Sequence, residues 1–363
     1  MRVLQVFKDY FPPSRGGVEQ HIHEVVGALE GVEFTVLTSS RHRRQVIDYD
    51  RGVRIIRAPE LFRPVSTPVT PSWVRHLRNT PADVIHAHMP NPFGELCILA
   101  AHAPAPLVAT YHADIIGRRA LMPFFAPFQQ RFLKKARRIV VTNPRVVDRS
   151  KVLGPHRAKA VVIPFGVDAA YWSERPYGAA ALSEAYPGKI ILFLGRLAYY
   201  KGLDVLLHAM RGVDATCLIV GEGPMKASLQ QLAKDLGLPG RVVFVGSVED
   251  EKRRDYFHAA DLFVLPSTSS AEGFGISMLQ AMACGTPAIS TELGTGTSWV
   301  NLNDTTGLVV PPRDPSALAA AINGLLADPA RLEAMGHQAA ERVQSTFSRA
   351  CMLESLSSLY ASV

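Results

Sequence analysis

Short apolar segments alternate with amphipathic segments along the whole chain of 363 residues. Between the first two apolar segments, Val18, Ile22, Val25, Val26 and Leu29 recur at the spacing of one helix face, which predicts a helix there. In this first half the apolar segments predict strands at 3–7, 34–37, 53–57, 84–86, 107–111, 139–142 and 160–163.

A second series of strands and helices follows the polar stretch 173–188. It predicts strands at 190–194, 216–220, 242–245, 262–265, 288–290 and 308–310, separated by helices that begin near Leu203, Met225, Asp250, Ile276 and Pro315. Several strands are apolar throughout, as expected where helices cover both faces of a parallel sheet. The chain is therefore predicted to be α/β, with two doubly wound, Rossmann-like parallel sheets and a ligand cleft between the lobes at the carboxyl ends of the strands.

The tail 329–363 is helical in pattern, with a break predicted at 345–348. We expect a first domain over 1–170 and a second over 171–345. The last helix, about 346–363, either packs back onto the first domain or caps the second.

Composition narrows the class of protein. Hydrophobic residues make up 47% and charged residues 20%, which excludes a disordered chain. No apolar run reaches the ~18 residues of a spanning helix, and the opening MRVLQVFKDYF lacks the pattern of a secretory signal. The four cysteines lie far apart, which favours free thiols in a reducing cytoplasm. We therefore expect a cytoplasmic protein, which would be peripheral to the membrane if the basic segment described below contacts lipid.

Charge is distributed unevenly. Residues 1–170 hold 24 basic and 13 acidic side chains, a formal charge of +11, whereas 171–363 hold 15 and 19, a charge of −4. An anionic membrane, an anionic lipid or nucleic acid would suit the basic half, and so would a solvated arginine-rich surface. Nucleic acid is disfavoured because the basic residues lack interleaved stacking aromatics. The basic, phenylalanine-rich segment 118–138 suggests either a helix at an anionic membrane surface or, by default, a helix packed on its own sheet with a basic outer face.

Four turns at predicted strand ends carry the candidate chemistry, because helix N-termini there favour anions. In GRLAYYKG, Arg196 and Lys201 suit a diphosphate, although two solvated surface cations would explain them equally well. In EGFG, Glu272 suits a pair of sugar hydroxyls, or else caps a helix. The turns FPPSRGG and ELGTGTSWVN offer amide-rich phosphate cradles or plain turns, and neither the dinucleotide fingerprint nor the Walker loop is complete.

Taken together, these turns resemble glycosyltransferase family 4, the retaining nucleotide-sugar enzymes of GT-B fold. The resemblance rests on PPSRGGVE, TYHADI, GRLAYYKG, VGEGP, VFVGSV, EGFGISMLQAMACGTP and TGLVVPP, in that order over nearly the whole chain. It implies an acceptor-binding first domain and a donor-binding second domain.

The resemblance also implies a role for each matching residue. Catalytic roles fall to Glu272, which would bind hydroxyls of the donor sugar, to His112 near the reacting sugar, and to Arg196 and Lys201 at the donor diphosphate. The remaining implied donor contacts are Gly16, Gly17, Gly246, Val248, Gly273, Phe274, Gly275 and Gln280. No metal ligand and no cofactor are implied.

Gln280 departs from the family pattern, in which a second glutamate stands eight positions after the first and binds the ribose. An amide oxygen still accepts a hydrogen bond but loses the charge assistance, so donor affinity is expected to fall by roughly 1 kcal/mol. A harsher interpretation is a much-reduced enzyme, which the retention of Arg196, Lys201 and Glu272 argues against.

The sequence thus predicts a retaining, metal-independent hexosyltransferase acting on a lipid-linked, polysaccharide or small-molecule acceptor. GDP-mannose is favoured as donor, because GTGTSWVNLNDTTGLVVPP resembles bacterial mannosyltransferases of surface-polysaccharide assembly. Two alternatives stay open: a sugar-nucleotide epimerase of the same fold, and a non-catalytic protein that docks on membranes or binds sugar.

Overall fold

The computed structural model describes residues 1–363 except 15, 65–66 and 113–121. Its contacts divide the chain into two compact units. The N-terminal unit comprises Met1–Pro164 and Leu353–Val363, and the C-terminal unit comprises Phe165–Met352. Each unit is an α/β layer structure with its own buried core.

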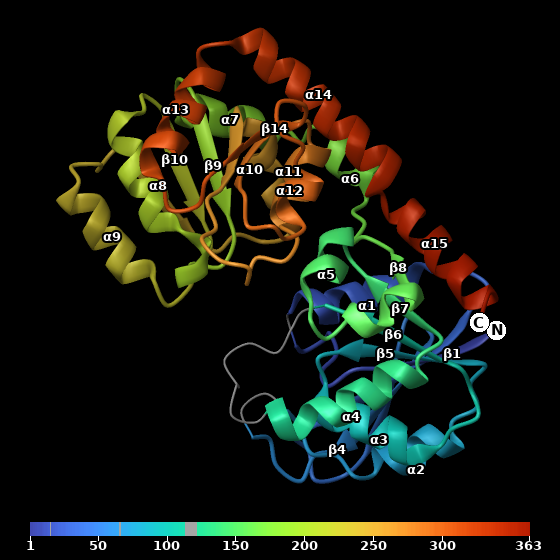
Figure 1. Ribbon diagram of the computed structural model, residues 1–363. Helices are drawn as coiled ribbons and strands as arrows, with labels where there is room; N and C mark the ends of the chain where they lie inside the picture. The colour runs from blue at the N-terminus through green and yellow to red at the C-terminus, as the bar shows by residue number, and fades with distance from the viewer. Residues whose placement is uncertain (15, 65–66, 113–121) are drawn as a thin grey trace. The chain divides into compact units, whose positions relative to one another are not determined.

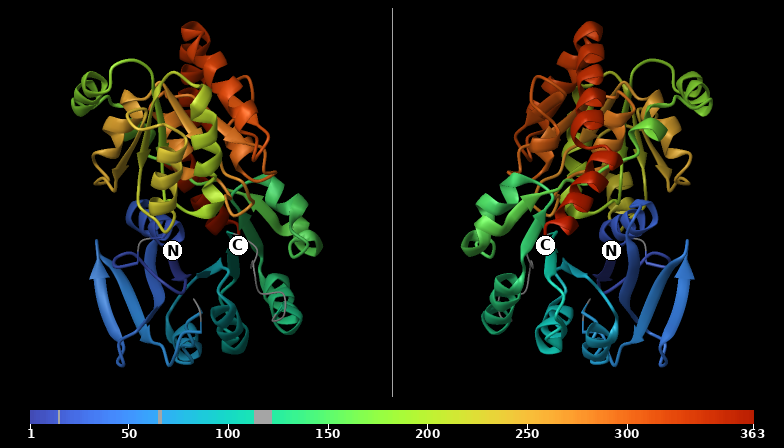
Figure 2. Two further views of the ribbon diagram at one scale, coloured as in Figure 1. Left: turned by 90° about the vertical axis from the view of Figure 1, so that its left-hand side faces the viewer. Right: turned by 90° about the vertical axis from the view of Figure 1, so that its right-hand side faces the viewer.

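The N-terminal unit contains an eight-stranded sheet in the order β3-β4-β2-β1-β5-β6-β7-β8. All neighbouring strands are parallel except the β3–β4 pair, a hairpin at the outer edge that Figure 2 shows clearly. The strands are β1 (Arg2–Val6), β2 (Glu33–Ser40), β3 (Val46–Asp50), β4 (Val53–Pro59), β5 (Val84–Met89), β6 (Leu107–Tyr111), β7 (Arg138–Val141) and β8 (Ala160–Val162).

Helices cover both faces of this sheet. In Figure 1, α2, α3 and α4 lie on one face, and α1, α5 and the end of α15 lie on the other. The helices are α1 (Gly17–Ala28), α2 (Trp73–Asn79), α3 (Pro92–Ala101), α4 (Met122–Lys135), α5 (Pro144–Arg149), the 3-10 helix η1 (Gly154–Lys159) and α15 (Arg349–Ala361).

The C-terminal unit contains a six-stranded, all-parallel sheet in the order β11-β10-β9-β12-β13-β14. Its central strands are buried at every position, which explains why their sequences do not alternate. The strands are β9 (Ile190–Leu194), β10 (Thr216–Val220), β11 (Val242–Gly246), β12 (Leu262–Leu265), β13 (Ala288–Thr291) and β14 (Gly307–Val310).

In this unit α8, α9 and α13 pack together on one face, and α6, α7, α10, α11 and α14 pack on the other (Figure 1). The short α12 follows β13. The helices are α6 (Ala169–Ser173), α7 (Gly178–Ala185), η2 (Tyr199–Lys201), α8 (Leu203–Ala209), η3 (Met210–Gly212), α9 (Lys226–Asp235), α10 (Arg253–Ala259), α11 (Ile276–Ala283), α12 (Thr297–Val300), α13 (Pro315–Leu326) and α14 (Pro329–Thr346).

The two parallel sheets confirm the predicted fold class, and every predicted strand is present. The break predicted in the tail is confirmed between α14 and α15. The antiparallel strand β3 was not predicted, because none of its five residues, VIDYD, is buried and they form no clear apolar run.

Candidate active site

The turn after β9 brings two cations to the carboxyl edge of the C-terminal sheet. Arg196 lies exposed just beyond the strand, whereas Lys201 ends the 3-10 turn η2 with only 8% of its surface exposed. Gly202 follows in the left-handed region at φ 67°, and a side chain there would collide with the Pro266 carbonyl oxygen. This glycine therefore lets the β9 turn approach the neighbouring β12 turn closely.

Lys201 and Glu272 form a buried ion pair. The Tyr200 carbonyl accepts a 2.8 Å hydrogen bond from the Thr268 amide, which fixes the two turns to one another. Lys201 Nζ then lies 2.5 Å from Glu272 Oε2, and Ser267 Oγ donates to the same oxygen at 3.2 Å. Two of the predicted site residues are thus brought together, and the charge of Lys201 is compensated within the protein.

The segment after Glu272 is anchored by a buried aromatic side chain. Phe274 is 4% exposed and packs edge-on against Trp299 and Phe347. The flanking Gly273 accepts a 2.8 Å hydrogen bond from the Gly296 amide, which joins the EGFG turn to the GTGTS turn. Gly275, at φ 83°, precedes the first residue of α11. Two of the predicted turns therefore form one continuous surface at a helix N-terminus.

Other predicted donor contacts lie on the same unit. Gln280 is half-buried on α11, and its side-chain amide has no hydrogen-bond partner among the described residues. Gly246 ends β11 at φ 86°, and Val248 lies half-buried in the loop that follows. The Gly246 carbonyl accepts a 2.7 Å hydrogen bond from Gly221, which ties the β11 end to the β10 turn.

The sequence interpretation missed several polar residues of this edge. Ser267 was read only as part of a loop, yet its hydroxyl supports Glu272. Glu222 and Lys226 pair at 2.6 Å beside Gly246. The glycines of GEGPMK are the sequence feature that could have indicated this part of the site, because Gly223 lets the turn approach the Leu197 backbone closely.

The N-terminal unit holds the remaining predicted residues. Gly16 precedes α1 and Gly17 is its first residue, with the Gly17 backbone exposed. The Glu19 side chain lies against Gly16, and burial raises the pKa of its carboxyl above the ordinary value. Gly16, Gly17 and His112 belong to a different unit from Arg196, Lys201 and Glu272.

His112 follows β6 and is held by its neighbours. Its amide donates to the Met89 carbonyl at 3.2 Å, and its ring stacks on His88 with centroids 5.3 Å apart. His112 Nε2 lies 3.0 Å from His88 Nδ1. Burial, with the nearby rings of His21 and His86, lowers the pKa of His112 well below 6.5, so the ring is neutral at physiological pH.

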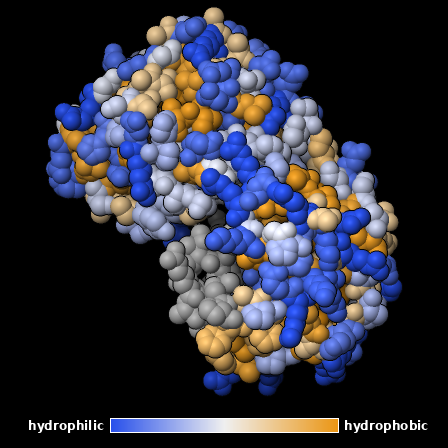
Figure 3. All heavy atoms as spheres, in the orientation of Figure 1, coloured by the Kyte–Doolittle hydropathy of each residue, from blue (hydrophilic) through white to orange (hydrophobic). Residues whose placement is uncertain are grey.

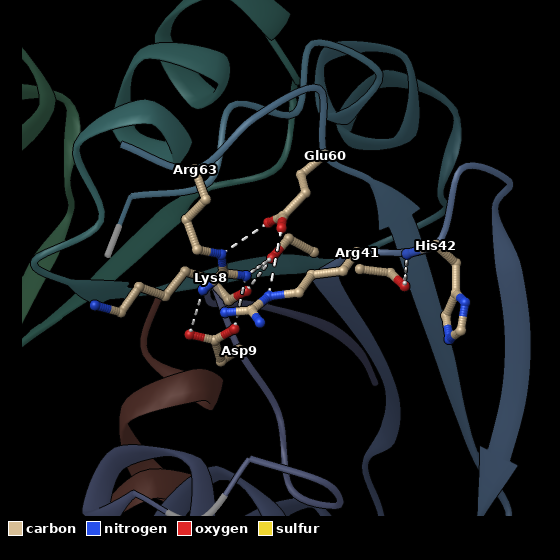
Figure 4. A network of polar contacts seen from close by, with 8 residues as sticks. Lys8, Asp9, Arg41, His42, Glu60 and Arg63 are labelled. Atoms are coloured by element: carbon tan, nitrogen blue, oxygen red, sulfur yellow. Dashed lines mark hydrogen bonds and ion pairs between the residues drawn. The ribbon is translucent and has the colours of Figure 1, made fainter. Parts of the chain in front are cut away.

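A polar cavity of about 770 Å³ opens at the carboxyl ends of β1, β2 and β4. Figure 4 shows the network beside it, in which Arg63 donates to Asp9, Glu60 and Ser39. Arg41 reaches toward Glu60 at 3.8 Å and stays largely exposed. The cavity therefore offers fixed carboxylate acceptors and guanidinium donors side by side.

Helix α4 packs one face against the sheet and leaves two phenylalanine side chains exposed, and the expected contact with a membrane stays a prediction. Phe132 and Leu133 are buried against the sheet, whereas Phe124 is 77% exposed and Phe128 is 40% exposed. Figure 3 shows hydrophobic side chains at the surface over the start of this helix. The part of the segment at 118–121 lies outside the described residues. Within the described ranges, no helix has the length and apolar character needed to span a membrane.

Metal-binding side chains do not gather in the described part of the chain. No group of three or more histidine, cysteine, aspartate or glutamate side chains there has an arrangement that could hold an ion.

Two family models match the chain, one in each half. "Glycosyltransferase Family 4" matches residues 15–171, and "Glycosyl transferases group 1" matches residues 181–342. The chain is 34% identical to O-antigen chain mannosyltransferase C of Escherichia coli, over 100% of this chain and 99% of that one. It is 36% identical to D-rhamnosyltransferase WbpZ of Pseudomonas aeruginosa, over 96% and 92%.

A further relative at 30% identity, covering 90% of each chain, is a GDP-mannose-dependent α-(1-6)-phosphatidylinositol monomannoside mannosyltransferase of Mycolicibacterium smegmatis. Among solved structures, sucrose-phosphate synthase of Thermosynechococcus elongatus shares the fold with a TM-score of 0.83 at 24% identity, covering 99% of this chain and 98% of that one. The chain belongs to the family 4 glycosyltransferases of GT-B fold, enzymes that transfer a sugar from a nucleotide donor.

Proposed function

We propose that this protein is a retaining, metal-independent mannosyltransferase that uses GDP-mannose and extends a lipid-linked or saccharide acceptor. The observation that carries the proposal is the buried Lys201–Glu272 pair at the strand ends, with Arg196 exposed in the same turn. Departure of a nucleoside diphosphate places negative charge on phosphate oxygens, and fixed cations stabilise that charge more in the transition state than before it.

The roles divide by charge. In the proposed reaction Arg196 and Lys201 bind the diphosphate, and Glu272 accepts hydrogen bonds from sugar hydroxyls. These two cations take the place of a divalent ion, so activity is expected to persist in EDTA. Front-side attack assisted by the leaving phosphate needs no protein nucleophile, and we assign none.

Mannose is favoured as the transferred sugar because two relatives are named as mannosyltransferases, one of them GDP-mannose-dependent. The rhamnosyltransferase relative supports a second candidate, D-rhamnose, which is mannose without its 6-hydroxyl. The two donors share the nucleotide and most of the sugar, so only a direct comparison separates them.

The donor test uses GDP-mannose, GDP-D-rhamnose, UDP-glucose and UDP-N-acetylglucosamine, each assayed by slow hydrolysis without acceptor. We expect hydrolysis of GDP-mannose, with EDTA present, to exceed that of both UDP-sugars. Proton NMR of the transfer product should show the anomeric configuration of the donor. Preference for a UDP-sugar, a need for added metal, or an inverted product each overturns its part of the proposal.

For the acceptor, we propose that the cavity beside β1, β2 and β4 binds a saccharide. Hydroxyl groups both donate and accept, and the Asp9 carboxylate and Arg63 guanidinium group, which line the cavity and are hydrogen-bonded to each other, offer both partners in fixed positions. Arg41→Ala should raise the KM for α-mannobiose several-fold while acceptor-free hydrolysis of GDP-mannose stays unchanged. An unaltered acceptor KM contradicts this placement.

For the membrane, we propose that the start of α4 docks the protein on an anionic surface. Exposed Phe124 and Phe128 supply apolar area, and Arg131, Lys134 and Lys135 are exposed on the same helix. Co-sedimentation with phosphatidylglycerol vesicles should fall in the Phe124→Ser/Phe128→Ser double variant. Tyr177→Ser, which removes a 95% exposed aromatic from the C-terminal unit, is the matched control and should bind like wild type.

A further inference from the structure

Polar side chains occupy the middle of the N-terminal sheet, where neighbouring residues are apolar. Gln5 on β1 lies opposite His86 on β5, and His88 lies two residues further along β5. All three are at most 2% exposed. Buried polar groups are costly unless they are hydrogen-bonded, so the partners of these side chains determine which atoms carry protons.

The Gln5 carbonyl oxygen sets the proton position on two histidines. Gln5 Oε1 can only accept, so His88 Nε2, 2.9 Å away, must donate to it. A neutral imidazole has a single N–H, so His88 Nδ1 is an acceptor and the proton in the 3.0 Å contact belongs to His112 Nε2. His112 is therefore the Nε2–H tautomer, and its Nδ1 is an acceptor nitrogen.

The same amide extends the chain in the opposite direction. Gln5 Nε2 donates to the Tyr360 hydroxyl at 3.1 Å, and that hydroxyl donates to His86 Nδ1 at 2.6 Å. His86 Nε2 then donates to Thr110 Oγ1 at 2.6 Å. Every hydrogen bond in this chain, from His112 to Thr110, points the same way, which strengthens each through its neighbours.

This series of hydrogen bonds requires neutral histidine rings, and burial keeps the rings neutral. Burial lowers the pKa of His86 to about 3 and that of His88 well below 6.5. The rings of His86 and His88 stack with centroids 4.6 Å apart, so two cations would repel at close range. His21 on α1 stands edge-on to His88, and burial lowers its pKa to about 4.

We propose that Gln5 and His88 are positioning residues that hold His112 as the neutral Nε2–H tautomer, so that it accepts a hydrogen bond from a hydroxyl of the transferred sugar instead of donating a proton. The sugar contact rests on the proposed function, whereas the tautomer follows from the hydrogen-bond chain alone. Tyr360 lies near the end of α15, in the C-terminal segment that belongs to the N-terminal unit. This segment therefore contributes a side chain to the same series of hydrogen bonds.

The tautomers are measurable without any substrate. Two-bond ¹⁵N–¹H correlation spectra of the histidine-labelled full chain at pH 7.5 distinguish a protonated Nε2 from a protonated Nδ1, with signals assigned from single histidine-to-glutamine variants. We expect Nε2–H for both His88 and His112. Nδ1–H on His88 would mean that the chain runs in reverse, and it overturns the inference whether or not the enzyme is active.

Three variants test the positioning role. Gln5→Leu removes the oxygen that accepts from His88 Nε2, so the proton of His88 should move to Nδ1. His112 Nε2 then becomes the acceptor, which makes His112 the Nδ1–H tautomer. We expect kcat/KM for GDP-mannose to fall about tenfold in this variant. Gln5→Glu keeps an acceptor oxygen and should restore both tautomers and most of the rate. Tyr360→Phe, which leaves the Gln5–His88 bond intact, should keep the tautomer of His112 and is the matched control.

The outcomes separate the two claims. Wild-type spectra as expected but no turnover of any nucleotide sugar would refute the proposed function and leave the tautomer assignment standing. A Gln5→Leu variant with switched tautomers and an unchanged kcat/KM would refute the positioning role. If Gln5→Leu does not fold, the wild-type spectra still decide the tautomer, and the kcat/KM of Gln5→Glu decides the role: a rate lost despite native tautomers contradicts it.

Discussion

Lys201 and Glu272 should be strongly coupled in stability. Their charged atoms lie 2.5 Å apart and each side chain is about nine-tenths buried. At an effective dielectric constant of about 20 the gross attraction is on the order of 6 kcal/mol, which the desolvation of both groups largely offsets. Removing one partner, however, leaves the other charge buried alone, at a cost of about 3–5 kcal/mol.

We therefore expect Lys201→Met and Glu272→Leu each to lower the free energy of unfolding by about 3 kcal/mol or more. The double variant should lose no more than either single variant, because it leaves no uncompensated buried charge. For a unit of this size 1 kcal/mol corresponds to roughly 2–4 °C in Tm, so each single variant should melt at least about 6 °C lower.

Denaturant titration of the full chain measures the cycle. The exposed Lys252–Glu249 pair, with side chains 66% and 75% exposed, is the matched control and should couple by less than about 1 kcal/mol. Additive losses at Lys201 and Glu272 would refute the argument from burial. In Glu272→Leu the lysine is also released for phosphate, so GDP should bind at least as tightly as to wild type although sugar transfer is lost.

Four further outcomes are expected. Gln280→Glu should restore a charge-assisted hydrogen bond to ribose and tighten GDP binding by roughly 1 kcal/mol in calorimetry; unchanged affinity discards that role. Gly202→Ala should destabilise the C-terminal unit by at least about 1 kcal/mol, since φ 67° is unfavourable for alanine and its Cβ meets the Pro266 carbonyl; an unaltered Tm would be evidence against this close approach. Acidification below pH 6.5 should destabilise the N-terminal unit, because His86 and His88 stay neutral when folded but bind protons when unfolded, each adding a slope of up to about 1.4 kcal/mol per pH unit. Burial raises the pKa of Glu95 to about 7, so protonation of this carboxyl stabilises the folded protein as pH falls over the same range. Glu95→Gln removes this contribution, so the denaturation midpoint of the variant should fall more steeply than that of wild type between pH 7 and 5. A variant midpoint that does not change with pH would contradict both the histidine effect and the Glu95 effect.

Most of the fold could be predicted because buried parallel strands leave a clear pattern. The strands at 107–111, 190–194 and 216–220 were predicted to the residue, since each is a short, mainly apolar run between polar turns. Strand β3 could not be predicted, because an edge strand needs no buried face and none of its five residues, VIDYD, is buried. The strand forms because it pairs with β4, and this pairing cannot be recognised from the sequence of β3 alone.

The site was predictable where a turn carries its own signal and not where partners come from distant strands. Arg196, Lys201 and Glu272 stand in glycine-containing turns at strand ends, and that context marked them. The supports of His112 did not stand out, because Gln5 and His88 lie inside apolar strands 83 residues apart. A polar residue in the centre of a buried strand is the signal that would have found them, since it implies a partner on the neighbouring strand.

The Lys201–Glu272 pair also bears on how a charged donor could enter a buried site at low cost. The ammonium group of a lysine that is only 8% exposed would be strongly destabilised if it stood alone. Glu272 supplies its counter-charge in the free protein, and in the proposed reaction the diphosphate takes over that role. Glu272 is then released to accept hydrogen bonds from sugar hydroxyls. Because Lys201 exchanges one anion for another, donor binding requires no new desolvation of the lysine, and the same exchange prepares the carboxylate for the sugar.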